Sequence, residues 1–248
     1  MLVVDGQPVR VRVARTGEDI LFGADAPGRE QAAEAIGRMR FALGVDDDLR
    51  PFVEEFRDDP LIGASIRRKP WLRPHRRPRP WEALAWAITE QLIEYKRAAA
   101  IQRRLVRRIG PRSVEWDLSD VPSAKAVAGL APAEIVSLDL AATRVQTLRR
   151  VAGAAAAGRI DFAAPADALA RRLQSFPGVG RWTADITALH GLGDFSALPA
   201  GDLGYLKAVG RNLSGGDPKG FATEEQVRDF FKPYGPWGGL AAAHFLSA

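Results

Sequence analysis

Two glycines stand immediately before a helical run in the segment FPGVGRWTADITAL, residues 176–189. Glycine adopts backbone conformations that a Cβ atom forbids, so the chain can reverse between a helix over 165–175 and another over 183–190. The amide groups that begin the second helix lack partners within it and carry partial positive charge, which favours an anion such as phosphate. The alternative is an ordinary loop between two helices with glycine caps.

A carboxylate follows in the Gly- and Pro-rich segment GLGDFSALPAGDLGYLKAVG, residues 191–210. Asp202 opens a short predicted helix over 203–209, and a helix N-terminus favours the ionised form of a carboxyl group. An ionised carboxylate can stabilise positive charge that develops during a reaction, and it can orient an attacking water. The structural alternative is that Asp202 simply caps the helix, and the two roles are compatible.

The elements that must position these residues are mostly helices, because helical periodicity dominates the chain after residue 28. The longest periodic segment covers 81–110 and stops at Gly110. Alternation over 9–15 and the segment 19–23 predict short strands near the start. The predicted fold class is mainly α, with a small β-containing N-terminal segment. Further helices are predicted over 29–43, 48–56, 123–129, 132–138, 139–156, 223–232 and 238–246.

The distribution of charge suggests a polyanionic partner. The net charge is +5, but residues 1–60 carry a net charge of −5, so the remainder is strongly basic. The stretch RRKPWLRPHRRPR, residues 67–79, holds seven Lys and Arg residues and no acid. The alternative is a solvated linker stiffened by proline. An RNA-binding role for this stretch is disfavoured because the sequence has no RNA-binding motif.

Several classes of chemistry and location are disfavoured by composition. The chain has no cysteine, which excludes disulfides, thiol catalysis and cysteine-held metals. The three histidines do not form a convincing metal site, and His190 and His244 are interpreted as structural residues within apolar helices. No apolar run approaches a membrane span and the start lacks a signal-peptide pattern, so we expect a cytoplasmic protein, nucleoid-associated in a bacterium, with no membrane partner.

The hairpin, the loop and the aspartate together resemble the helix-hairpin-helix DNA glycosylase superfamily, and above all the DNA-3-methyladenine glycosylase II family. The segments typical of that family are FPGVGRWTA (176–184), LPAGDLG (198–204) and AITEQLI (87–93). The resemblance covers roughly residues 78–248 and is weaker before them. We therefore expect an N-terminal segment over 1–66, a basic proline-rich linker over 67–80 and a helical helix-hairpin-helix glycosylase domain over 81–248.

The resemblance implies a monofunctional DNA glycosylase that hydrolyses the N-glycosidic bond of alkylated purines of the 3-methyladenine type in base excision repair. Asp202 would be its catalytic residue. Trp182 stands where related bifunctional enzymes place a lysine nucleophile, so water would be the nucleophile here. Two alternatives stay open: a glycosylase for another damaged base on the same scaffold, and a helix-hairpin-helix protein that binds DNA without catalysis.

The same resemblance implies a pocket for the extruded base. Trp182 would stack on that base, although a core tryptophan that packs the hairpin is the alternative. Ile186 and Leu246 occupy positions where some family members have aromatic residues, and Tyr205 and Trp237 are nearby aromatic residues. The matched motifs hold no histidine or second carboxylate to act as a general acid. Cationic alkylpurines should therefore be released much faster than hypoxanthine.

Contacts to double-stranded DNA are implied at two places. Leu92, with Gln91 beside it, would enter the gap that a flipped nucleotide leaves, although Leu92 also fits the apolar stripe of the helix over 81–110. In the hairpin, Gly178, Gly180 and Thr183 would present amides or a hydroxyl to phosphates. Arg181 would add a phosphate contact or remain a solvated charge.

The resemblance also implies an alkali cation at the hairpin, Na⁺ or K⁺, on the backbone carbonyls of Gln174, Phe176 and Val179. No cofactor is expected for catalysis. We expect the protein to act as a monomer on duplex DNA that contains damaged bases.

Overall fold

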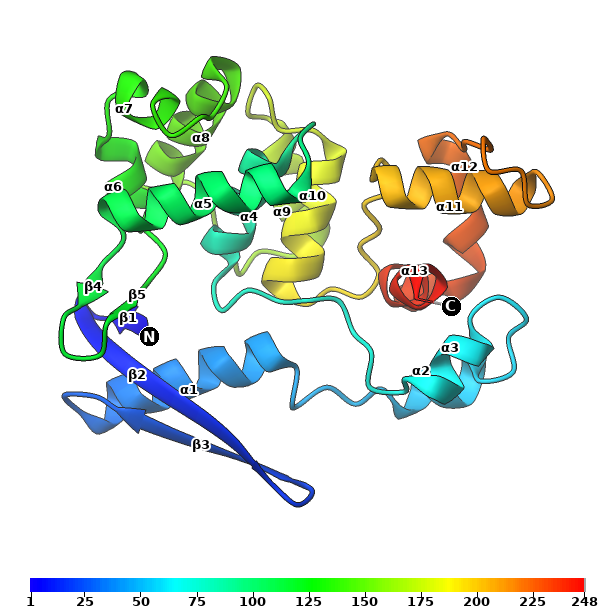
Figure 1. Cartoon of the computed structure of the whole chain (residues 1–248), viewed down its shortest axis with the longest axis horizontal. Helices are drawn as coiled ribbons and strands as arrows, with labels where there is room; N and C mark the ends of the chain where they lie inside the picture. The colour runs from blue at the N-terminus through cyan, green and yellow to red at the C-terminus, as the bar shows by residue number, and fades with distance from the viewer. Residues whose placement is uncertain (248) are drawn as a thin grey trace.

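The computed structural model describes residues 1–247 and is mainly helical, with a small antiparallel sheet near the N-terminus (Figure 1). The sheet has the order β1 (Leu2–Val4), β2 (Gln7–Thr16) and β3 (Asp19–Asp25), joined by tight turns. Leu2 pairs with Val9, and Arg10 pairs with Asp25. Helix α1 (Arg29–Leu43) covers the sheet and buries Ala35 in a small separate core. The prediction of fold class is confirmed.

The other elements follow in a nearly continuous series of helices. They are α2 (Arg50–Phe56), α3 (Gly63–Arg68), α4 (Pro80–Glu90), α5 (Tyr95–Ile109), β4 (Arg112–Ser113), β5 (Leu118–Ser119), α6 (Ala124–Gly129), α7 (Pro132–Val136), α8 (Ala142–Ala156), α9 (Ala166–Gln174), α10 (Arg181–Thr187), the π-helix η1 (Ala188–Leu192), α11 (Leu203–Leu213), α12 (Glu224–Phe231), the 3₁₀ helix η2 (Lys232–Trp237) and α13 (Gly238–Leu246). Within residues 1–247, none of the helices is both long and apolar enough to cross a membrane.

Two large hydrophobic cores organise these helices. The first lies among α4, α5 and the helices from α6 to α10, with Leu84, Leu148 and Leu173 at its centre. The second joins α11, α12 and α13 to α2 and α3, whose side chains Phe52 and Ile66 are fully buried in it. In Figure 1, α2 and α3 lie beneath α13, although α13 is far from them in the sequence. The predicted N-terminal segment thus contributes to the same core as the C-terminal helices.

The helix predicted over 81–110 is wrong in one respect, because the chain breaks there into α4 and α5. Residues 91–94 form a turn in which Leu92 adopts a left-handed backbone conformation with φ of 55°. The side chain of Leu92 is 98% exposed, so Leu92 does not belong to an apolar stripe. A leucine in a left-handed conformation and without buried contacts suggests a functional constraint on this turn.

The basic stretch is held by internal contacts along much of its length. Arg76 is buried, bonds to Asp47 at 2.9 Å and stacks over the ring of Phe195. Arg79 makes a bidentate ion pair with Asp120, which also accepts a bond from the backbone amide of Val3. Buried bidentate pairs of this kind fix geometry. The stretch therefore connects α3 to α4 as a docked segment, and several of its charges have protein partners.

Candidate active site

The two glycines of the hairpin have different structural roles. Helix α9 ends at Gln174 and α10 begins at Arg181, so the chain reverses within six residues. Gly178 has φ of 86°, and a Cβ atom there would lie 2.2 Å from Oγ1 of Thr147. Gly180 precedes α10, and a Cβ atom there would meet nothing within 4 Å. Gly178 is thus required by the turn itself, whereas the surface at Gly180 is open to a ligand.

Gln91 ties the turn between α4 and α5 to this hairpin. Its side-chain amide donates to the carbonyl of Gly178 at 3.0 Å and to the hydroxyl of Thr183 at 2.9 Å. Thr183 is only 1% exposed. The predicted role of its hydroxyl toward phosphate is therefore wrong, because that oxygen faces Gln91. The Gln91 side chain likewise supports the hairpin from inside, beside the exposed side chain of Leu92.

Arg181 is exposed at the first turn of α10 and lies 3.9 Å from Asp185, a distance typical of a weak ion pair. Its guanidinium group therefore remains accessible to a phosphate. The structure leaves its predicted role open.

Asp202 lies where the sequence predicts it, at the N-cap of α11. Its Oδ1 atom accepts a hydrogen bond from the backbone amide of Gly204 at 2.8 Å. The loop before it is braced by Arg228 of α12, which bonds to the carbonyl of Leu198 at 3.2 Å and to Asp185 of α10 at 2.9 Å. Arg228 thereby fixes the loop of the aspartate relative to the second helix of the hairpin.

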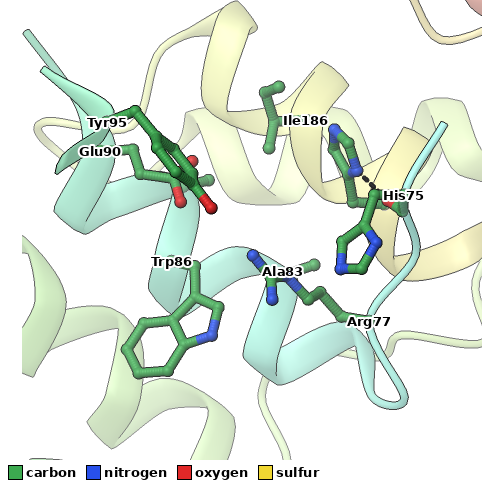
Figure 2. A pocket seen from close by; sticks show the side chains of 9 residues that line it. His75, Arg77, Ala83, Trp86, Glu90, Tyr95 and Ile186 are labelled. Carbon is green, nitrogen blue, oxygen red and sulfur yellow. Dashed lines mark hydrogen bonds between the residues drawn. The ribbon is translucent and has the colours of Figure 1, made fainter. Parts of the chain in front are cut away.

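A cavity of about 300 Å³ opens beside α4, and we call it the α4 cavity (Figure 2). Four parts of the chain form it: the segment before α4, the helix α4 with the start of α5, α10, and η1. Its lining residues are His75, Arg77, Ala83, Trp86, Ala87, Glu90, Tyr95, Ile186 and His190. This volume is at the lower end of the range of small-molecule sites, roughly 300–1,000 Å³.

Burial and the charge of Asp202 affect the pKa values of three groups, of which Glu90 and His190 line the α4 cavity. Burial raises the pKa of Glu90, and the negative charge of Asp202 adds to this effect. Burial lowers the pKa of His190, while the charge of Asp202 acts in the opposite direction. Burial also raises the pKa of Tyr205, with a second contribution from Asp202. Asp202 itself does not line the α4 cavity, but the contacts of Arg228 join its loop to α10, which forms one wall of the cavity.

The predicted base pocket agrees with the α4 cavity at one residue, Ile186. Tyr205 is buried and packs edge-on against Phe231, and Trp237 packs against Phe52, so both belong to the second core. The assignment of Tyr205 to the pocket is wrong because its ring is buried in the core, whereas Trp237 is half-buried at the edge of that core and its assignment stays a prediction.

Two other predicted pocket residues lie near the site without lining the α4 cavity. Trp182 is half-buried on the first turn of α10. Leu246 is 48% exposed and close to Asp202, since a Cβ atom on Gly204 would lie 3.1 Å from Oδ1 of Asp202 and 3.7 Å from Leu246. Their predicted contacts with a base remain predictions.

Sequence reasoning missed the polar residues of the α4 cavity. His190 was interpreted as structural, but it lines the cavity, with its Nδ1 atom against the carbonyl of His75. Its own carbonyl accepts from the amide of Arg77 at 2.7 Å. The motif AITEQLI contains Glu90, so the statement that the matched motifs hold no second carboxylate is wrong. The available signal was a glutamate within this motif, two residues before Leu92.

His244 has the structural role that the sequence predicts. It is fully buried, and its Nδ1 atom lies 3.0 Å from Oγ of Ser65. Its ring packs 5.3 Å from the ring of Phe52 in the second core. Burial lowers the pKa of His244 to about 4, so the ring is neutral near pH 7.

The carbonyls predicted to hold an alkali cation lie at the end of α9 and in the turn. Gln174 is the last residue of α9, and the carbonyl of Phe176 accepts from the amide of Val179 at 3.0 Å. Helix C-termini expose carbonyl oxygens and carry partial negative charge. A set of neutral oxygen donors at such a terminus suits an alkali cation.

The fold is that of the helix-hairpin-helix DNA glycosylases. The solved structure of a 3-methyladenine DNA glycosylase from Archaeoglobus fulgidus matches it with a TM-score of 0.84, covering 99% of this chain and 84% of that chain at 20% sequence identity. No family model matches the sequence.

Among curated proteins, the chain is similar to the DNA-3-methyladenine glycosylase of Bacillus subtilis (strain 168), with 24% identity over 79% of this chain and 66% of the relative. It is also similar to DNA-3-methyladenine glycosylase 2 of Escherichia coli (strain K12), with 28% identity over 64% of this chain and 54% of the relative. The resemblance predicted from the motifs is confirmed. The chain spans between about half and two thirds of the length of these two relatives.

Proposed function

We propose that the protein is a monofunctional DNA glycosylase that releases alkylated purines of the 3-methyladenine type from double-stranded DNA in base excision repair. The observation that carries this proposal is the position of Asp202. Its carboxylate is the N-cap of α11, and Arg228 joins its loop to α10, which forms one wall of the α4 cavity. The names of the sequence relatives support the same activity.

The chemistry assigned to Asp202 is electrostatic. Cleavage of an N-glycosidic bond leaves positive charge on the sugar while the base departs with the bonding electrons. A fixed carboxylate beside the sugar stabilises that charge and orients the water that attacks C1′. The amide of Gly204 holds Asp202 in place, and the pair from Arg228 to Asp185 holds the surrounding loop.

The duplex is handled by the hairpin and by the turn after α4. Backbone amides at Gly178 and Gly180, together with Arg181, would contact phosphates. Carbonyls of Gln174, Phe176 and Val179 would hold Na⁺ or K⁺, which supplies positive charge beside the DNA backbone. Leu92 projects into solvent with 98% exposure and would fill the gap that the flipped nucleotide leaves.

A water mechanism fits the cavity better than a lysine mechanism. Among residues 1–247, the residues that line the α4 cavity include no lysine. Lys207 is exposed on α11, five residues beyond Asp202. We therefore expect an intact abasic strand as the product, and no adduct after borohydride treatment. A trapped adduct of protein and DNA would refute the monofunctional assignment.

The decisive test is Asp202→Asn, since asparagine also caps helices and should preserve the fold. Loss of one electrostatic stabiliser costs about 3–4 kcal/mol in transition-state stabilisation, so single-turnover excision should fall at least a hundredfold. Binding to a duplex that contains an abasic site should persist. Near-normal excision by the variant would refute the role of Asp202.

Single-turnover excision by the wild-type protein, measured on duplexes with different damaged bases, distinguishes two other functions. If duplexes with oxidised or deaminated bases are processed and alkylated ones are not, the protein is a glycosylase for another lesion. If every duplex is bound and none is processed, it is a helix-hairpin-helix protein that binds DNA without catalysis. The carboxylate at Asp202 favours the enzyme over that alternative.

A further inference from the structure

Glu90 is a carboxyl group at the α4 cavity for which the proposed cleavage step has no use. It is the last residue of α4, and Figure 2 shows it among the residues that line the cavity, as is Tyr95. The side-chain amide of Gln102 donates to its Oε1 atom at 2.9 Å and to the hydroxyl of Thr89 at 3.0 Å. Gln102 therefore fixes the orientation of this carboxyl group from behind.

Titratable groups from the neighbouring elements line the α4 cavity together with Glu90. Arg77 faces it from the segment before α4 and stabilises the carboxylate. Asp202 acts from the loop before α11 and disfavours the carboxylate, as burial does. Tyr95 from α5, His75 from the segment before α4 and His190 from η1 complete the titratable lining. Burial is the strongest of these influences and raises the pKa of Glu90.

A partly desolvated carboxylate of this kind prefers a cationic occupant. A positive charge in the cavity compensates for the solvation that the carboxylate loses on burial, and the low local dielectric strengthens the attraction. A neutral purine offers no such compensation. Purines alkylated at a ring nitrogen carry a positive charge, and their N–H groups can donate to a carboxylate.

We propose that Glu90 is a specificity-determining residue, whose carboxylate binds the positively charged alkylated base in the α4 cavity in preference to neutral bases. This inference rests on the proposed function. Glu90 acts on binding and leaves bond cleavage to Asp202. During cleavage the positive charge moves from the base to the sugar, so a carboxylate at the base stabilises the bound substrate at least as well as the transition state.

The test compares Glu90→Gln with the wild-type protein on two duplexes of one sequence, one with 7-methylguanine and one with hypoxanthine. Single-turnover rates measured against protein concentration give a half-saturation concentration and a maximal rate for each duplex. For Glu90→Gln, the half-saturation concentration should rise at least tenfold more for 7-methylguanine than for hypoxanthine. The maximal rate on 7-methylguanine should stay within about threefold. In the wild-type protein, half-saturation for 7-methylguanine should improve as rising pH ionises Glu90, and this dependence should vanish in the variant.

Glu225→Gln is the matched control, because it removes the same charge from an exposed residue of α12 that lies outside the hairpin, the turn after α4 and the α4 cavity. It should affect both duplexes alike. Glutamine at position 90 is isosteric and can still accept from Gln102, and Glu90→Asp, which keeps the charge, should retain part of the preference.

Four outcomes would overturn the inference. Equal changes on the two duplexes would mean that Glu90 has a structural role, and a loss confined to the maximal rate would mean that it acts in cleavage. A variant that no longer folds, together with a Glu90→Asp variant that folds but has lost the preference for 7-methylguanine, would also count against it. Wild-type protein that releases neither base would overturn the proposed function and this inference with it.

Discussion

The side chain of Gln91 donates a hydrogen bond to the backbone carbonyl of Gly178, 87 residues further along the chain. The bond joins the turn that exposes Leu92 to the hairpin that is proposed to bind phosphate. Two parts of the proposed DNA-binding surface are thereby held at a fixed separation. The second bond of Gln91, to the buried hydroxyl of Thr183, makes the same connection from inside.

Gln91→Ala should lower both stability and excision. Two hydrogen bonds are lost and the Thr183 hydroxyl loses a partner, so the free energy of unfolding should fall by about 1–2 kcal/mol. Excision from duplex DNA should fall more than excision from single-stranded DNA, because the turn with Leu92 is no longer anchored. Chemical denaturation and single-turnover kinetics measure the two effects. Gln146→Ala, at an exposed position of α8, serves as the control and should change neither quantity.

The two hairpin glycines should respond differently to substitution. Gly178→Ala should destabilise the protein by at least about 1 kcal/mol, because alanine disfavours the left-handed conformation and its Cβ atom would collide with Thr147.

Gly180→Asp should leave stability nearly unchanged, since the space there is open. It should weaken binding to all DNA sequences alike and flatten the salt dependence. Unchanged affinity in the folded Gly180→Asp variant would mean that the hairpin is only a structural turn.

Leu92→Ala should separate stability from function. The side chain has almost no buried surface to lose, so the free energy of unfolding should change by no more than about 0.5 kcal/mol. Excision from a matched duplex should fall at least tenfold, while excision from single-stranded DNA should be preserved. By contrast, Ile88→Ala in the buried part of α4 should cost about 2–5 kcal/mol in stability. Normal excision from duplex DNA by Leu92→Ala would exclude the proposed role of Leu92 in filling the gap that the flipped nucleotide leaves.

His244 should make the protein less stable in mild acid. Its pKa is about 4 in the folded state, below the unfolded value of about 6.5, so the unfolded chain binds more protons between these values. Stability is therefore lost as pH falls from 6.5 toward 4, by about 2 kcal/mol between pH 7 and pH 5 from this residue.

The variant His244→Gln can still bond to Ser65 but does not titrate. Urea denaturation at pH 7 and pH 5 should show a smaller loss of stability for this variant than for the wild-type protein. The lowered pKa values of His75 and His190 should sustain part of the remaining dependence. An identical pH dependence in both proteins would contradict the prediction.

Local features of the sequence were sufficient to predict much of the helical structure and the position of Asp202. Periodicity marks α1, α8 and α12 within a few residues, because one face of each helix must be apolar. The position of Asp202 at the N-cap of α11 was also predictable, because a cap is read from adjacent residues. The resemblance to the glycosylases likewise rests on short continuous motifs.

Tertiary structure decided which side chains meet at the α4 cavity. Glu90, His190 and Arg77 come from three separate parts of the chain, and no local pattern specifies their approach. Tyr205 is predicted to line the pocket as an aromatic residue near the aspartate, but its ring is buried against Phe231 in the second core. The end of α4 at Glu90 could not be predicted from helical periodicity, for a related reason. Leu92 adopts a left-handed backbone conformation in a turn that Gln91 anchors to the hairpin, far away in the sequence. Helical spacing carries no information about such a contact.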